Sequence, residues 1–113
     1  MAHEEVTIER RGDVMLAEVR GEVDLSNVSP VRAQLLKAVP NAATALVLDL
    51  SHTDHLDSSG VRLIFELSER LESRGQGLRL VVPDGSAISR VLEITEVHRV
   101  VPVSSSVAAV LPP

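Results

Sequence analysis

The side chains best suited to chemistry gather in one short segment, residues 51–60, which reads Ser-His-Thr-Asp-His-Leu-Asp-Ser-Ser-Gly. Its last four residues, Asp57, Ser58, Ser59 and Gly60, lie where an apolar strand pattern gives way to a helical one. Hydroxyl groups at a helix start lie near free backbone N–H groups and the positive end of the helix dipole, which favours an anion such as phosphate. Serine and aspartate are also common N-cap residues. The segment is therefore either a plain helix cap or a phosphate-related site.

Two other kinds of chemistry use the same segment. A serine hydrolase would draw its nucleophile, base and orienting carboxylate from Ser58 or Ser59, His52 or His55, and Asp54 or Asp57. The segment lacks the Gly-x-Ser-x-Gly pattern, and a base three residues before its serine is unusual. A divalent metal could be held by His52, Asp54, His55 and Asp57. These residues have no preferred geometry in a surface loop, so a solvated loop without metal is the favoured interpretation.

Length and composition exclude several classes of protein. The chain, residues 1–113, has the size of one domain, and 44% hydrophobic with 24% charged residues is a globular composition. A net charge of -5 and a single aromatic residue argue against a nucleic-acid ligand, which needs clustered cations or stacking platforms. No cysteine is present, and no apolar run approaches the roughly 18 residues of a membrane span. We expect a cytoplasmic protein with no membrane span and no cofactor.

The elements that must position these side chains follow from changes in hydrophobic period. Strands are expected at residues 6–9, 14–20, 45–50, 78–82 and 100–103. Helices are expected at residues 30 to about 39, 59 to about 74, 87 to about 95, and from a cap at 104–106 through 111. Gly21 should end the second strand, and Ser29 should cap the first helix. The order predicts an α/β domain with a mostly parallel sheet of about five strands, an antiparallel first strand and about four helices.

Residues 45–50 and 78–82 contain few polar side chains, so both should be interior strands. Loops 22–29 and 51–60 follow strands and are the places where such a sheet gathers functional groups. On the helix from residue 59, Phe65 should be buried, whereas Leu63 and Leu67 widen the apolar arc. These two leucines either form a partner patch flanked by Arg62, Glu66 and Arg70 or pack on the neighbouring helix.

Three segments together resemble the STAS domain of bacterial anti-sigma factor antagonists. They are Gly-Glu-Val-Asp-Leu at 21–25, the strand 46–50, and Leu-Asp-Ser-Ser-Gly-Val-Arg at 56–62. Arg-Val-Leu-Glu-Ile at 90–94 and Val-Pro at 101–102 agree with the resemblance, which runs from about residue 5 to residue 111. The sequence differs from the family pattern at His55, where an apolar or aromatic residue is common, and at Glu96, where a glycine often ends the third helix.

The resemblance implies a partner-switching protein and not an enzyme. Unphosphorylated, it would bind an anti-sigma factor that is also a serine kinase and so release a sigma factor; phosphorylation at Ser58 would reverse this. Asp57 would orient the acceptor hydroxyl, while Ser59 and Gly60 would shape the helix start. Gly60 lacks a Cβ, which would let a partner approach closely. A phosphatase is a further candidate partner.

The partner or ligand surface is expected to draw on both loops and the helix. Its candidate residues are Asp24, Ser26, Asn27, Arg62, Leu63, Glu66 and Leu67. Two alternatives remain open. A stand-alone STAS domain could serve a transporter, a lipid-trafficking complex or a stress-signalling complex, and the loops around Asp24 and Ser58 could instead bind a small ligand or nucleotide.

Overall fold

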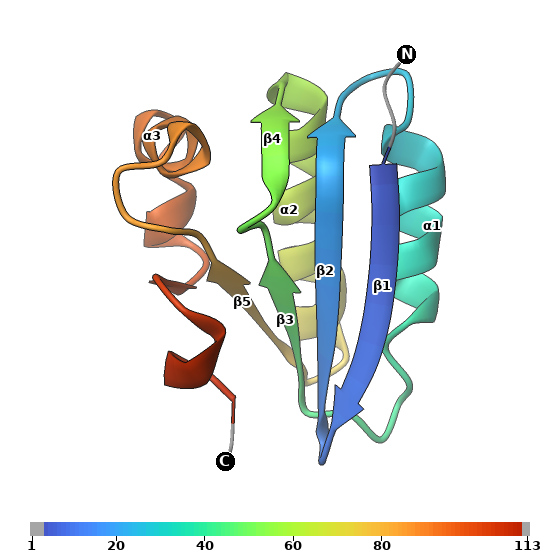
Figure 1. Ribbon diagram of the computed structural model, residues 1–113. Helices are drawn as coiled ribbons and strands as arrows, with labels where there is room; N and C mark the ends of the chain where they lie inside the picture. The colour runs from blue at the N-terminus through green and yellow to red at the C-terminus, as the bar shows by residue number, and fades with distance from the viewer. Residues whose placement is uncertain (1–3, 112–113) are drawn as a thin grey trace.

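A six-stranded sheet forms the centre of the computed structural model, which describes residues 4–111 (Figure 1). The strands are β1 (Glu4–Arg11), β2 (Val14–Val23), β3 (Ala45–Asp49), β4 (Thr53–Leu56), β5 (Gly77–Val81) and β6 (Val103–Ser104). The helices are α1 (Val28–Lys37), α2 (Ser58–Ser73) and α3 (Ala87–Ile94), with short 3-10 turns at Val97–Arg99 and Val107–Ala109. The α/β architecture is confirmed, with one strand more than expected and three helices plus two 3-10 turns in place of about four helices.

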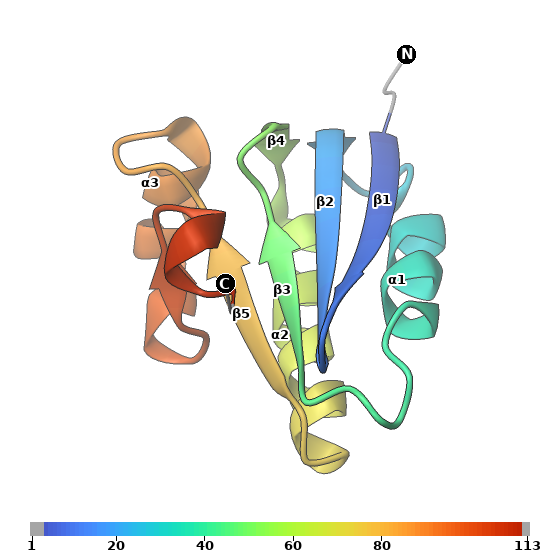
Figure 2. The same cartoon turned by 60° about the horizontal axis from the view of Figure 1, so that its bottom comes forward.

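The sheet has the order β1-β2-β3-β5-β6, and β4 pairs with the end of β2. Only β1 and β2 are antiparallel to each other; the other paired strands are parallel. The prediction that β3 and β5 are interior strands is confirmed, because β3 lies between β2 and β5, and β5 lies between β3 and β6. Helices α1 and α2 lie side by side behind the sheet in Figures 1 and 2. Both begin at the same end of the sheet, near the tips of β2 and β4.

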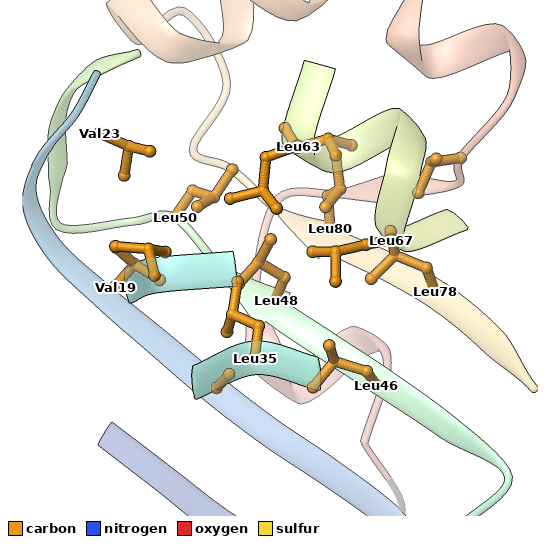
Figure 3. Close-up of a cluster of buried hydrophobic side chains, with 14 of the residues drawn as sticks. Val19, Val23, Leu35, Leu46, Leu48, Leu50, Leu63, Leu67, Leu78 and Leu80 are labelled. Carbon is orange, nitrogen blue, oxygen red and sulfur yellow. The ribbon is translucent and has the colours of Figure 1, made fainter. Parts of the chain in front are cut away.

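The core lies between the sheet and these two helices. Figure 3 shows side chains of β2, β3 and β5 meeting leucines of α1 and α2. Leu63 and Leu67 are 3% and 1% exposed, so they belong to this core and are not surface residues. Of the two alternatives for these leucines, interior packing is the right one. Phe65, expected to be buried, is only partly buried at the edge of the core, because the buried arc of α2 is centred on Ile64, Leu67 and Leu71.

Strand β4 and the last residues of β2 are not predicted by the hydrophobic pattern of the sequence. Gly21 does not end β2, which continues to Val23 and pairs there with β4. The sheet register shifts between Gly21 and Glu22, and the φ angle of 90° at Gly21 is one that glycine tolerates well. The sequence of β4 resembles a polar loop because only its first and last residues, Thr53 and Leu56, are buried.

Several element ends differ from expectation. Helix α1 begins at Val28 with Asn27 as N-cap, before the predicted cap Ser29. The predicted strand 100–103 is reduced to the two-residue β6, which follows a 3-10 turn at Val97–Arg99. The last helix is only a 3-10 turn without a side-chain cap bond. Helices α2 and α3 lie within one residue of their predicted bounds. After α3, Glu96 adopts a φ of 62°, a left-handed conformation that favours the glycine expected there from the family pattern.

Candidate functional site

Pairing between β2 and β4 brings the two loops predicted to carry function together. Val23, the last residue of β2, is the register partner of Leu56, the last residue of β4. The Asp57 N–H group then donates to the Val23 carbonyl at 3.3 Å. As a result, the turn that follows β2 lies beside the first turn of α2, at the upper end of the sheet in Figure 1.

Asp57 is the N-cap of α2, as the capping interpretation predicts. One carboxylate oxygen, Oδ1, accepts from the N–H groups of Ser59 at 2.9 Å and Gly60 at 3.1 Å. The other oxygen, Oδ2, accepts from the N–H of Leu25 at 3.2 Å, thirty-two residues earlier in the chain. Asp57 therefore fixes the backbone at the helix start and ties the first loop to it. Within residues 4–111 it makes no hydrogen bond to the Ser58 hydroxyl, so its bonds support a capping role and not direct orientation of that group.

Ser58 is the first residue of α2, and its side chain is exposed. No hydrogen bond of the Ser58 hydroxyl to another described residue is present, whereas Ser59, next to it, is half-buried. The backbone under Ser58 is held by the cap, while the hydroxyl itself faces solvent. Of the two adjacent serines, Ser58 is thus the more accessible to another protein.

Gly60 is needed for packing inside the domain. A Cβ atom at this position would lie 2.3 Å from Leu56 Cδ1 and 3.3 Å from the Val23 carbonyl oxygen. The missing side chain therefore faces β4 and β2, and Gly60 is buried. The expectation that Gly60 leaves room for an approaching partner is wrong: it lets α2 lie close to the sheet.

The loop from Asp24 to Asn27 is a tight, internally bonded turn. The Asp24 carboxylate accepts from the Ser26 hydroxyl and, at 2.9 Å, from the Ser26 N–H. These bonds, with backbone N–H groups and nearby His55, lower the pKa of the Asp24 carboxyl below its ordinary value. Asn27 is 6% exposed and bonds to the Glu22 carbonyl at 2.8 Å and the Asp24 N–H at 2.9 Å. Ser26 is at the surface, Asp24 is half-buried, and Asn27 has a structural role in the turn.

Leu25 is not among the residues that the sequence predicts for the partner surface. Its side chain is 78% exposed, and its N–H is the group bonded to Asp57, one residue before Ser58. An exposed leucine beside a solvent-facing serine offers a partner both an apolar contact and a hydroxyl. The signal available in the sequence was a single apolar residue among Asp24, Ser26 and Asn27 in a short polar turn.

The remaining candidates lie along α2. Arg62 is exposed and lies four residues after Ser58, so the two share one face of the helix. Glu66 is half-buried and forms an ion pair with Arg32 of α1, with Arg32 Nε at 2.8 Å from Glu66 Oε2. Glu66 therefore links the two helices, while Arg62 is exposed near the start of α2.

The histidines of the loop do not assemble a triad in the described part of the chain. His52 Nδ1 lies 3.5 Å from Glu18, and His55 is exposed on β4. No described hydrogen bond joins either histidine to Ser58, and both oxygens of Asp57 bond to backbone N–H groups. Residues 4–111 contain no group of three or more histidine, aspartate or glutamate side chains that could hold a metal ion. None of the described helices is both long and apolar enough to cross a membrane.

Comparisons with known proteins agree with the fold. The Anti-sigma-F factor antagonist RsfB of Mycobacterium tuberculosis is 30% identical over 90 residues, which cover 79% of this chain and 71% of that protein. An anti-sigma factor antagonist from Mycobacterium paratuberculosis has a similar structure, with a TM-score of 0.86 at 22% identity, covering 95% of this chain and 90% of that one. SpoIIAA in its unphosphorylated form gives a TM-score of 0.74 at 20% identity, covering 94% and 93% of the two chains. The STAS domain pattern matches residues 5–110, and the chain belongs to the STAS domain family.

Proposed function

We propose that this chain is an anti-sigma factor antagonist whose binding to its anti-sigma factor is switched off by phosphorylation of Ser58. The observation that carries the proposal is the exposed Ser58 hydroxyl at the first position of α2, in a chain whose relative RsfB is an anti-sigma-F factor antagonist. The proposed role is binding in a regulatory pathway. The chain would be the substrate of a kinase and not itself a catalyst.

The fold is suited to carry a phosphate at Ser58. A phosphate adds about -1.5 to -2 charge at neutral pH. The N-terminus of α2 lies next to it and favours negative charge by about 0.3 to 1 kcal/mol. Arg62, one turn further on the same face, supplies a cation nearby. Because the Asp57 carboxylate is close and opposes the added charge, we expect a small net change in domain stability.

A phosphate on Ser58 would weaken partner binding much more than it would destabilise the fold. The N–H of exposed Leu25 bonds to Asp57, the residue before Ser58, so one partner surface can cover both the leucine and the serine. A charge left desolvated and unpaired in an interface costs about 2 to 5 kcal/mol. At about 1.4 kcal/mol per factor of ten, this lowers affinity by tens to thousands of times. Phosphorylation would thus release the partner without unfolding the domain.

The partner in this proposal is an anti-sigma factor with serine kinase activity, and a phosphatase would restore the binding form. The setting is the cytoplasm, where transcription takes place. Asp24, Ser26 and Arg62 lie at or near the same surface and complete the proposed contact region. Leu63 and Leu67 are excluded from it because they are buried, and Asn27 supports the turn from within.

Calorimetric titration against the anti-sigma factors encoded in the source genome tests the proposal. Wild-type chain and Ser58→Ala should bind one of them with similar affinity, and Ser58→Glu should bind at least about tenfold more weakly. Ser105→Glu, which changes another exposed serine in the same way, is the matched control and should bind like wild type. Equal binding by Ser58→Glu and wild type would refute the proposed switch.

A further inference from the structure

The outer edge of β5 is only partly covered by the rest of the chain. On one side, β5 pairs with β3 over its whole length, from Gly77 to Val81. On the other side, β6 pairs only with Leu80 and Val81. The first half of β5 therefore has an edge that no strand of the described chain covers.

The direction of the backbone groups at this edge follows from the hydrogen bonds that β5 makes with its neighbours. Gly77 N–H donates to the Thr44 carbonyl, and the Val81 carbonyl accepts from Leu50, so the odd-numbered residues of β5 bond toward β3. Leu80 N–H donates to Pro102, and Val82 N–H donates to Ser104, both at 2.9 Å, so even-numbered residues bond toward β6. By the same alternation, the N–H and C=O groups of Leu78 point to the open edge.

A proline explains why β6 does not extend to Leu78. In the register set by Leu80 and Val103, the donor to the Leu78 carbonyl would be the N–H of residue 102. Residue 102 is proline and has no N–H group. Among residues 4–111, no carbonyl accepts from the Leu78 N–H on this side either. One backbone donor and one backbone acceptor are thus available side by side.

A groove of about 250 Å³ lies at this edge, and it is lined by Gly77, Leu78, Arg79, Val100, Pro102 and Glu72, among others. Val100 is 58% exposed and offers an apolar wall. Gln76 also lines the groove and is 7% exposed. Its Nε2 donates to the carbonyls of Pro40 and Ala43, but its buried Oε1 has no partner among the described residues. Three hydrogen-bonding groups without a partner among the described residues therefore lie at one groove: the Leu78 N–H, the Leu78 carbonyl and Gln76 Oε1.

We propose that this groove binds a short extended segment of a protein partner, which adds to the sheet as a strand beside Leu78. Addition of a strand to an open sheet edge is a known mode of peptide recognition, in which backbone bonds give affinity and alternate side chains give specificity. The residue opposite Leu78 is apolar, because it lies against Val100. Its neighbours point to the face that carries Arg79, so an acidic residue is favoured there. The groove reaches the C-terminal half of α2, at the other end of that helix from Ser58, so both surfaces can be occupied together.

Amide hydrogen exchange followed by NMR tests the first half of the proposal. In the free chain, the Leu78 amide should exchange about tenfold or more faster than the amides of Arg79 and Leu80, which are bonded to neighbouring strands. The probe is the peptide acetyl-Thr-Asp-Val-Asp-Thr-amide, added to about 1 mM or more. It should slow exchange at Leu78 and shift the signals of Gly77, Arg79 and Val100.

Matched controls separate strand addition from loose binding. The same peptide with Val and the following Asp methylated at nitrogen keeps its charge but loses two N–H groups, and it should not protect Leu78. Arg79→Glu should weaken binding of the first peptide by about three- to tenfold, whereas Arg90→Glu, an exposed arginine on α3, should not.

Four results would overturn the proposal. The first is slow exchange of Leu78 in the free, dilute chain, which would mean that the edge is already covered. The second is equal protection by the methylated peptide, and the third is no response to either peptide. The fourth is protection of Leu78 that rises with protein concentration in the absence of peptide, because the occupant would then be a second copy of this chain.

Discussion

Replacement of Asp57 tests whether this residue fixes the start of α2 and the turn before α1. Loss of an N-cap side chain costs about 0.5 to 2 kcal/mol. Asp57→Ala also frees the Leu25 N–H, which Oδ2 accepts at 3.2 Å, so we expect a total loss of about 1 to 3 kcal/mol. Asp57→Asn keeps one oxygen for the N–H groups of Ser59 and Gly60 but loses the charge at the helix start. It also loses the acceptor for the Leu25 N–H, so it should cost about 1 to 2 kcal/mol, less than Asp57→Ala only because the bonds to Ser59 and Gly60 remain.

Urea denaturation gives the free energies, and hydrogen exchange at the Leu25 amide gives a readout specific to the link between the loops. Both Asp57 variants should speed exchange at Leu25. Ser86→Ala is the matched control: Ser86 caps α3 through one bond to the Ser89 N–H at 3.1 Å, and its loss should destabilise the domain without affecting Leu25. A cost below about 0.5 kcal/mol for Asp57→Ala, or unchanged exchange at Leu25, would refute this reasoning.

Three further substitutions test the packing described above, each by urea denaturation. Gly60→Ala should destabilise by about 1 to 2 kcal/mol despite its better helix propensity, because the new Cβ would lie 2.3 Å from Leu56 Cδ1; a stabilised variant would contradict this. Phe65→Ala should cost about 1 to 3 kcal/mol, below the range for a fully buried phenylalanine, because Phe65 is partly exposed; a cost above about 4 kcal/mol would be inconsistent with its position. Glu96→Gly should stabilise by about 0.5 to 1 kcal/mol, because φ is 62° there, and a destabilised variant would show that the Glu96 side chain matters more than the backbone.

The elements that the sequence predicts well are those whose burial is uniform or strongly periodic. All five residues of β3 are buried, and the corresponding apolar run is visible in the sequence. The start of α2 was also predictable, because Asp57 acts as a local cap whose bonds to Ser59 and Gly60 span only two and three residues.

Features that depend on distant partners could not be predicted in this way. Strand β4 has two exposed residues between two buried ones, and its existence depends on pairing with β2 more than thirty residues earlier. The bond from Leu25 to Asp57 follows from that pairing. The packing role of Gly60 cannot be predicted from the sequence for the same reason, since only the position of Leu56 shows which way the missing side chain would point.

Mapping the phosphate tests most directly whether Ser58 is the acceptor. The chain is incubated with its kinase-type anti-sigma factor, ATP and magnesium, and the modified residue is located by peptide mass spectrometry. We predict a single phosphate on Ser58 in wild type and in Ser59→Ala, and none in Ser58→Ala, whose stability should stay within about 0.5 kcal/mol of wild type because Ser58 is not the cap. A phosphate on Ser59, or an unmodified wild-type chain, would contradict the account.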